Sequence, residues 1–297
     1  MPLGRHIFSH CRSSLWITRF VVYATIARDY FPTVAAMARP FVQPLPQLRG
    51  LFVGSGSDGM SDPLVAQAIL KMTTSGNPSS TKPAVVYLGT ATYDLDGPRQ
   101  RQTEQFAQQG CTVESLNVAT LPLTPQGAAL LDTADIIIVS GGNTLYAIDR
   151  WKHLGLDTKL QQAMERGAVL TGGSAGAICW FDGGHSDSMD PDTWRDAMLN
   201  NMDATSGDES SSAPKSAQDA KAWEYIRIQG LGFLPGLVCP HYDRIQSNGV
   251  LRATDFESML LRHSTELGIG IDHWAALQVE GDSFTVVSLP SVRTKQL

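Results

Sequence analysis

The stretch AVLTGGSAGAICW, residues 168–180, constrains the fold more than any other part of this sequence. An apolar run of the kind that forms a buried strand stops at two glycines, and small apolar residues resume after Ser174. Only small neighbours, here Gly173, Ala175 and Gly176, let a backbone turn sharply enough between a strand and a helix to project a serine hydroxyl. The stretch therefore indicates a nucleophile elbow in an α/β fold.

Two other interpretations of the same glycines stay open at this point. Gly172, Gly173 and Gly176 could simply let a helix pack closely on a strand, or they could cradle a phosphate as in a dinucleotide site. A P-loop is excluded, because no Gly-Lys-Ser/Thr sequence follows the glycines. Other sequence features are needed to choose among these roles for the glycines.

From residue 50 onward, short apolar runs alternate with amphipathic segments, which is typical of a parallel sheet with helices on both faces. Strands are expected at 50–54, 84–89, 111–118, 135–140, 168–172, 236–240 and 268–272. Helices are expected at 61–73, 97–110 and 156–167, and a closing hairpin at 275–288. Ser61 is the expected N-cap of the first helix, with Pro63 in its first turn.

Two segments depart from this rhythm. The first fifty residues carry six arginines, no lysine and one acid, Asp29, which is typical of an organellar transit peptide; a translation start at Met37 explains the composition equally well. We therefore treat 1–48 as a leader and 49–297 as a single catalytic domain. Residues 200–221 are polar and of low complexity, which predicts a flexible surface insertion.

Composition narrows the partners and the compartment. The formal charge of −6 argues against a nucleic-acid binder, and four cysteines without a CxxC pair indicate neither a zinc site nor a disulfide framework. The most apolar stretch is interrupted by Arg19, well short of the ~20 residues that span a membrane. We expect a small substrate and a cytoplasmic protein, or a mitochondrial or other organellar one if 1–48 is a transit peptide.

A serine hydroxyl is a poor nucleophile unless a base lies within hydrogen-bond reach, and histidine is the usual base. His241, in GLVCPHYD, would lie just past the carboxyl end of a strand, at the sheet edge where Ser174 also lies. His185, in GGHSDSMD, is the competitor. His263 and His273 are expected to be surface groups at a helix end or a strand end.

A third group should orient the imidazole, and a pair of N–H donors should bind the substrate oxygen. Spacing alone does not choose among the acids that follow the elbow, which are Asp182, Asp187, Asp190 and Asp192. A glycine turn at 140–143 follows another buried strand, and a backbone N–H of Gly141 or Gly142 could complement that of Ala175. The same turn could instead be a plain helix start with Asn143 or Thr144 as N-cap.

Taken together, the stretches SGGNTLYAIDRW, GGSAGAICWFDGGHSDS, CPHYD and GIGID resemble the peptidase E family of aspartyl dipeptidases. This family is grouped with the cyanophycinases in the class I glutamine amidotransferase-like fold, and the resemblance runs over residues 50–290 in the right order. It implies a three-layer, doubly wound, mostly parallel α/β sheet of flavodoxin-like type. It also implies a serine hydrolase with a Ser-His-acid triad and no cofactor or metal.

The resemblance assigns roles by motif. Ser174 matches the nucleophile and His241 matches the base, while the family's acid lies some fifteen residues after the serine. That distance favours Asp187 and leaves Asp190 open. The oxyanion donors carry over as the backbone of Gly142 and Ala175.

The implied substrates are short peptides, in particular dipeptides with an N-terminal aspartate. The substrate carboxylate needs a cation, for which Arg244 and Arg252 are candidates, with Asn143 as a weaker contact. Two alternatives stay open, a cyanophycinase-like hydrolase of β-aspartyl peptides and a non-catalytic binding module. Amide transfer from glutamine is disfavoured, because amidotransferases carry a cysteine where this chain has Ser174. A homodimer also stays open.

Overall fold

Two β-sheets organise the part of the chain that the computed structural model describes, residues 22–23, 48–74, 82–200 and 221–289. The larger sheet has seven strands in these ranges. In spatial order they are β12 (Ser283–Ser288), β11 (Ala275–Glu280), β2 (Arg49–Val53), β6 (Val169–Gly173), β5 (Ile136–Val139), β3 (Ala84–Leu88) and β4 (Thr112–Ser115). The five strands β2, β6, β5, β3 and β4 are parallel. β11 pairs antiparallel with both β2 and β12, so that β12 forms the edge of the sheet.

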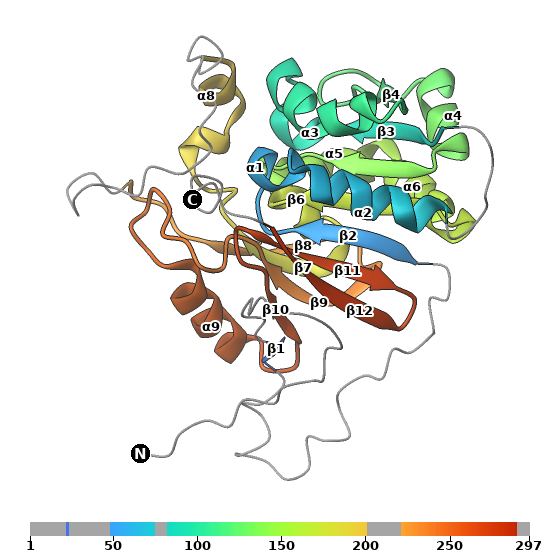
Figure 1. Cartoon of the computed structure of the whole chain (residues 1–297). Helices are drawn as coiled ribbons and strands as arrows, with labels where there is room; N and C mark the ends of the chain where they lie inside the picture. Colours follow the sequence, from blue (N-terminus) through green and yellow to red (C-terminus); the bar gives the residue numbers. More distant parts are fainter. Residues whose placement is uncertain (1–21, 24–47, 75–81, 201–220, 290–297) are drawn as a thin grey trace, which may run out of the picture.

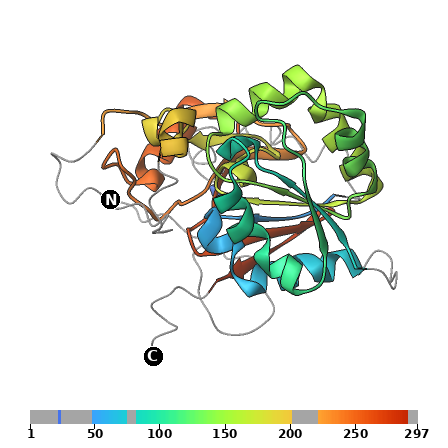
Figure 2. The ribbon, with the colours of Figure 1, turned by 90° about the horizontal axis from the view of Figure 1, so that it is seen from above.

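Helices cover both faces of this sheet, as Figures 1 and 2 show. One face packs against α2 (Pro63–Thr74) and α3 (Asp96–Gln108), and the other packs against α4 (Pro125–Thr133), α5 (Thr144–Leu154) and α6 (Leu156–Arg166). Successive strand residues point to opposite faces, so Leu51 and Val53 lie in the first layer and Phe52 in the second. This three-layer arrangement confirms the predicted fold class.

The smaller sheet has five strands among the described residues. Its order is β1 (Val22–Tyr23), β10 (Gly268–Gly270), β9 (Leu234–Cys239), β7 (Phe181–Ser186) and β8 (Ile226–Gln229). α9 (Arg252–Arg262) lies against it and buries Phe256 and Met259 next to Leu237 (Figure 1). The strands expected at 236–240 and 268–272 therefore belong to a second sheet, because β9 pairs with β7 and β10 and not with the larger sheet.

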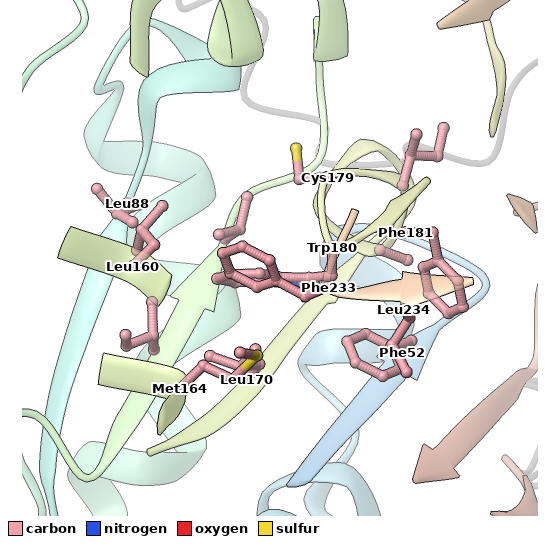
Figure 3. Packing of buried hydrophobic residues seen from close by; sticks show 14 of the residues in the cluster. Phe52, Leu88, Leu160, Met164, Leu170, Cys179, Trp180, Phe181, Phe233 and Leu234 are labelled. Atoms are coloured by element: carbon pink, nitrogen blue, oxygen red, sulfur yellow. The ribbon is translucent and has the colours of Figure 1, made fainter. Parts of the chain in front are cut away.

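A continuous apolar cluster joins the two sheets. The four-residue helix α7 (Ala175–Ile178) connects β6 to β7 and brings Trp180 and Phe181 into the core. Phe181 packs edge-on against Phe52 of the larger sheet at a centroid distance of 5.1 Å, and Figure 3 shows both rings within the cluster. The turn that carries Ser174 is thus fixed from both sheets by apolar packing.

The remaining elements are short. They are α1 (Ser57–Met60), the 3₁₀ turns Thr90–Thr92 and Pro191–Thr193, and α8 (Arg195–Asn200). The N-cap expected at Ser61 is wrong by one residue, because the Asp62 carboxylate accepts a hydrogen bond from the N–H of Leu64 and Pro63 is the first helical residue.

The leader and the polar insertion fall almost wholly outside the described residues. Of the predicted leader, only Val22–Tyr23, which pair with Gly268 and Ile269, and Leu48 are described. Of the predicted insertion, only residues 200 and 221 are described. Within the described ranges, no helix combines the length and the apolar character needed to cross a membrane.

Candidate active site

Ser174 stands at a strained corner between β6 and α7. Its backbone angles, φ 55° and ψ −120°, lie in a region that residues with a side chain rarely adopt. The turn is tight on both sides, since a Cβ on Gly173 would lie 2.0 Å from the Ser55 carbonyl oxygen and one on Gly176 would lie 2.1 Å from that of Val139. The predicted role of these glycines in a sharp turn therefore has a steric basis.

His241 lies beside this corner, just after β9. The backbone N–H of Ser174 donates to the carbonyl of Val53 at 3.1 Å, and the N–H of His241 donates to the next carbonyl, that of Gly54, at 2.9 Å. Both residues therefore sit at the carboxyl end of β2. His241 also has a positive φ, 49°. Ser174 Oγ makes no hydrogen bond to a described residue, which is common before substrate binds.

A second glycine turn approaches the serine side chain from β5. A Cβ on Gly141 would lie 3.5 Å from the Cβ of Ser174, and Gly142, with φ 114°, has no room for a side chain next to the Ala91 carbonyl. Within the described residues, neither the N–H of Gly142 nor that of Ala175 donates to an acceptor. Because α7 has only four residues, these N–H groups themselves, and not a long helix dipole, can bind an oxyanion.

The imidazole of His241 contacts a second histidine. Its Nδ1 lies 2.8 Å from Nδ1 of His273, whose Nε2 lies 3.0 Å from Oδ2 of Asp58 on α1. The expectation that His273 is a surface group is wrong, since it is 3% exposed. The pKa of His241 is held well below 6.5, first by withdrawal of the ring from solvent and then by the nearby positive charges of Arg252 and Arg244. His241 is therefore neutral at neutral pH.

The structure differs from the sequence expectation at the two candidate acids. Asp187 Oδ2 accepts hydrogen bonds from Arg252 and Gln246, each at 3.1 Å. Asp190 accepts from the hydroxyl of Ser247 at 2.7 Å and from a backbone N–H in its own turn, and burial raises its pKa. Neither carboxylate contacts His241 among the described residues, so both are held by other groups.

Arg252 is part of a buried polar cluster under α9. Its side chain is fully buried and donates to Asp187, to Gln246 Oε1 at 2.9 Å and to the His185 carbonyl at 2.5 Å. Its guanidinium carbon lies 5.0 Å from the centre of the Tyr225 ring. These partners hold the guanidinium within the protein.

His185, the competing base, belongs to the same cluster. Its Nε2 lies 2.8 Å from Asp255 Oδ1 and its Nδ1 lies 3.7 Å from Cys239 Sγ, so both nitrogens have protein partners. Burial lowers the pKa of His185 to about 4 and raises the pKa of the Cys239 thiol to about 12. His185 and the Cys239 thiol are therefore both uncharged at neutral pH. Neither contacts Ser174 in the described part of the chain.

The two remaining candidates have different surroundings. Asn143 is the N-cap of α5, and its amide nitrogen donates to the Ser188 carbonyl and the Thr193 hydroxyl, so its polar atoms are occupied. Arg244 follows His241 by three residues, and the backbone N–H of Arg244 donates to the His241 carbonyl at 2.9 Å. The Arg244 side chain is 39% exposed, and its Nε, 4.0 Å from Asp243, has no hydrogen bond within the described residues. Of the two candidate cations, Arg244 has the more exposed side chain.

This chain is similar to known proteins in sequence and in fold. A model of the family described as peptidase family S51 matches residues 51–287. A protein of Trypanosoma brucei brucei named G2/mitotic-specific cyclin-1 is 32% identical over 252 residues, which cover 79% of this chain and 73% of that protein. The uncharacterized peptidase YgaJ of Bacillus subtilis (strain 168) is 32% identical over 162 residues, which cover 54% of this chain and 56% of YgaJ.

Two crystal structures share the fold at low sequence identity. One is a candidate peptidase E protein from Listeria monocytogenes EGD-e, with a TM-score of 0.51 and 18% identity over 82% of this chain and 99% of that one. The other is a peptidase from an acI-B1 Actinobacterium, with a TM-score of 0.55 and 19% identity over 84% of this chain and 91% of that one.

Proposed function

Because this chain belongs to peptidase family S51 and is a serine peptidase, we propose that it hydrolyses short peptides, with dipeptides that begin with aspartate as its substrates. The observation that carries the proposal is the anchoring of Ser174 and His241 on two consecutive carbonyls at the carboxyl end of β2, those of Val53 and Gly54. This arrangement fixes a nucleophile and a neutral base relative to each other.

The mechanism is acyl transfer in two steps. The Nε2 of His241 takes the proton of the Ser174 hydroxyl as Oγ attacks the peptide carbonyl, and the N–H groups of Gly142 and Ala175 bind the oxygen on which negative charge develops. His241 then gives its proton to the leaving amine. A water molecule, activated by the same imidazole, releases the acyl group from Ser174.

Selection for aspartate requires a cation close to the acylated serine. Arg244 supports this role, because its side chain is 39% exposed and it follows His241 by three residues. A planar guanidinium binds a carboxylate through two parallel hydrogen bonds, which an amide side chain cannot reproduce. Arg244→Gln should therefore raise KM for Asp-X dipeptides more than for X-X dipeptides of similar size.

The test is hydrolysis by the purified full chain. We expect cleavage of α-Asp-X dipeptides that is lost in Ser174→Ala, which keeps the fold. Cleavage of β-aspartyl dipeptides alone would replace this proposal by a cyanophycinase-like activity. Activity that is unchanged in Ser174→Ala would refute the serine mechanism, and no covalent labelling of Ser174 by a fluorophosphonate would favour a binding module.

A further inference from the structure

His273 lies where the base of a Ser-His-acid triad would meet its carboxylate. We propose that His273, held by Asp58, takes the place of that carboxylate and sets the proton position of His241. The inference rests on the proposed function for its chemical meaning, since a serine reaction needs the base in one tautomer. It makes His273 and Asp58 positioning residues that act through His241.

The distances define a chain of hydrogen bonds with one consistent proton arrangement. The Asp58 carboxylate can only accept, so the Nε2 of His273, 3.0 Å away, carries a proton and donates it. In neutral His273 the Nδ1 is then bare and accepts from the Nδ1–H of His241 at 2.8 Å. This leaves the Nε2 of His241 bare, which is the form that can accept the proton of Ser174.

The opposite arrangement would disable the base. If His273 donated through Nδ1, the Nδ1 of His241 would have to accept, and the proton of neutral His241 would move to Nε2. A protonated Nε2 has no lone pair for the Ser174 proton. Asp58 favours the productive form, because its negative charge keeps the proton of His273 on the nitrogen that faces it.

The surroundings of His273 hold its ring in place. The backbone N–H of His273 donates to Asp243 Oδ1 at 2.7 Å, and its backbone carbonyl accepts from the Ser55 hydroxyl at 2.7 Å. The ring of Trp274 packs edge-on at a centroid distance of 4.9 Å. With 3% of His273 exposed, few water molecules can compete for the hydrogen bond to His241. The pair is therefore built to hold one geometry.

During the reaction, neither the Nδ1 proton of His241 nor the Nε2 proton of His273 needs to move. The Ser174 proton moves to Nε2 of His241, which becomes an imidazolium, while its Nδ1–H remains donated to His273. The neutral ring of His273 accepts this stronger hydrogen bond, and the negative charge of Asp58, on the far side of that ring, stabilises the imidazolium through it. On the substrate side, Nε2 of His241 remains the base and then the acid, as in the proposed mechanism.

A nitrogen NMR experiment tests the proton arrangement without any substrate. Uniform ¹⁵N labelling of histidine distinguishes bare from protonated ring nitrogens, and spectra of His241→Asn and His273→Gln assign the two signals. At neutral pH we expect a proton on Nδ1 and none on Nε2 of His241, with the reverse for His273. A His241 that carries its proton on Nε2 would overturn the proposal, whether or not the protein cleaves peptides.

Kinetics give a second, separate test once a cleaved substrate is known. Asp58→Asn should lower kcat by about 10-fold or more with KM nearly unchanged, and His273→Gln by about 100-fold. His273→Glu, which places a carboxylate next to His241, should recover much of that loss. The control is Asp132→Asn, whose exposed ion pair with Lys159 lies outside this chain of groups.

Two kinetic outcomes would refute the positioning role. One is a wild-type kcat in both Asp58→Asn and His273→Gln. The other is a His273→Glu variant that folds, by circular dichroism, but is no more active than His273→Gln. Failure of the proposed function would give a different result. The wild-type protein would cleave no peptide, while its NMR spectra would still show the expected tautomers of His241 and His273.

Discussion

Arg252 and Asp187 form an ion pair in which the arginine side chain is fully buried and the aspartate side chain is 13% exposed, with Nη1 and Oδ2 3.1 Å apart. The family resemblance favoured Asp187 over Asp190 as the triad acid, and Arg252 was one of two candidate cations for the substrate carboxylate. In the structure they bind each other. A buried guanidinium of this kind needs its carboxylate, because an uncompensated charge in the interior is strongly destabilising.

We expect Asp187→Asn to destabilise the protein by about 3 kcal/mol, the cost typical of removing one partner from a buried ion pair. Urea unfolding followed by fluorescence measures this change. The control is Asp192→Asn, which breaks an exposed ion pair with Lys221 and should change stability by less than about 1 kcal/mol. If Asp187 were instead the triad acid, Asp187→Asn would lower kcat steeply at nearly wild-type stability.

The parts of the fold that short stretches of sequence determine agree with the prediction. The apolar runs and glycine corners predicted the strands of the larger sheet and the turn at Ser174, and the family model confirms the resemblance to peptidase E. The second sheet was not foreseen, because β7, FDGGHS, carries no apolar run and is recognisable only by its pairing with β8 and β9.

The contacts of His241 could not be read from spacing. Asp58 and His273 lie at opposite ends of the described chain, and the pairing of β2 with β11 and of β9 with β10 brings them together beside His241. A polar His273 after a short strand gives no local sign that it is buried. Conversely, Asp187 lies at the expected distance from Ser174, but a partner from α9 holds its carboxylate.

The strain at Ser174 predicts a trade between stability and activity. Ser174→Gly should be more stable than Ser174→Ala by about 1 kcal/mol, because glycine adopts φ 55° without the Cβ clash that alanine keeps. Both variants should be inactive. Thermal and urea unfolding of the two proteins measure the difference, and equal stabilities would show that the corner is not strained.

The lowered pKa of His241 predicts where activity falls in acid. The active form is the neutral imidazole, so protonation as the pH decreases should abolish kcat/KM, and a pKa well below 6.5 shifts this loss to more acidic pH. We therefore expect kcat/KM to stay constant as the pH falls through 6.5. A decline that is centred at pH 6.5 or above would contradict the inferred environment of His241.

Two glycine-to-alanine substitutions distinguish the cost of a steric clash from the cost of a positive φ. A Cβ on Gly176 would lie 2.1 Å from the Val139 carbonyl oxygen, whereas one on Gly155, with φ 68°, meets nothing within 4 Å. Gly155→Ala should cost about 1 kcal/mol from its positive φ alone. Gly176→Ala should cost clearly more and displace Ser174, with loss of activity. Similar unfolding midpoints for the two variants would argue against the tight packing of the corner.

The hydrogen-bonded pair of buried His185 and partly exposed Asp255 predicts how the free energy of unfolding depends on pH. In the unfolded chain His185 binds a proton near pH 6.5, but in the folded protein burial lowers its pKa to about 4. Between these values the unfolded state binds more protons, so the free energy of unfolding decreases as the pH falls. The shift corresponds to a loss on the order of 3 kcal/mol by pH 4.

Asp255 acts in the same direction at lower pH. The hydrogen bond from His185 lowers its pKa, so its contribution to stability is present above the unfolded pKa and is lost as the pH falls through the folded one. Urea unfolding of wild type and His185→Gln from pH 7 to pH 4 tests both statements. The variant should start less stable at pH 7, because the hydrogen bond between His185 and Asp255 is lost or altered, and should lose less stability on acidification. An equally steep decrease in both proteins would mean that His185 does not resist protonation, and that another group makes the folded state sensitive to acid.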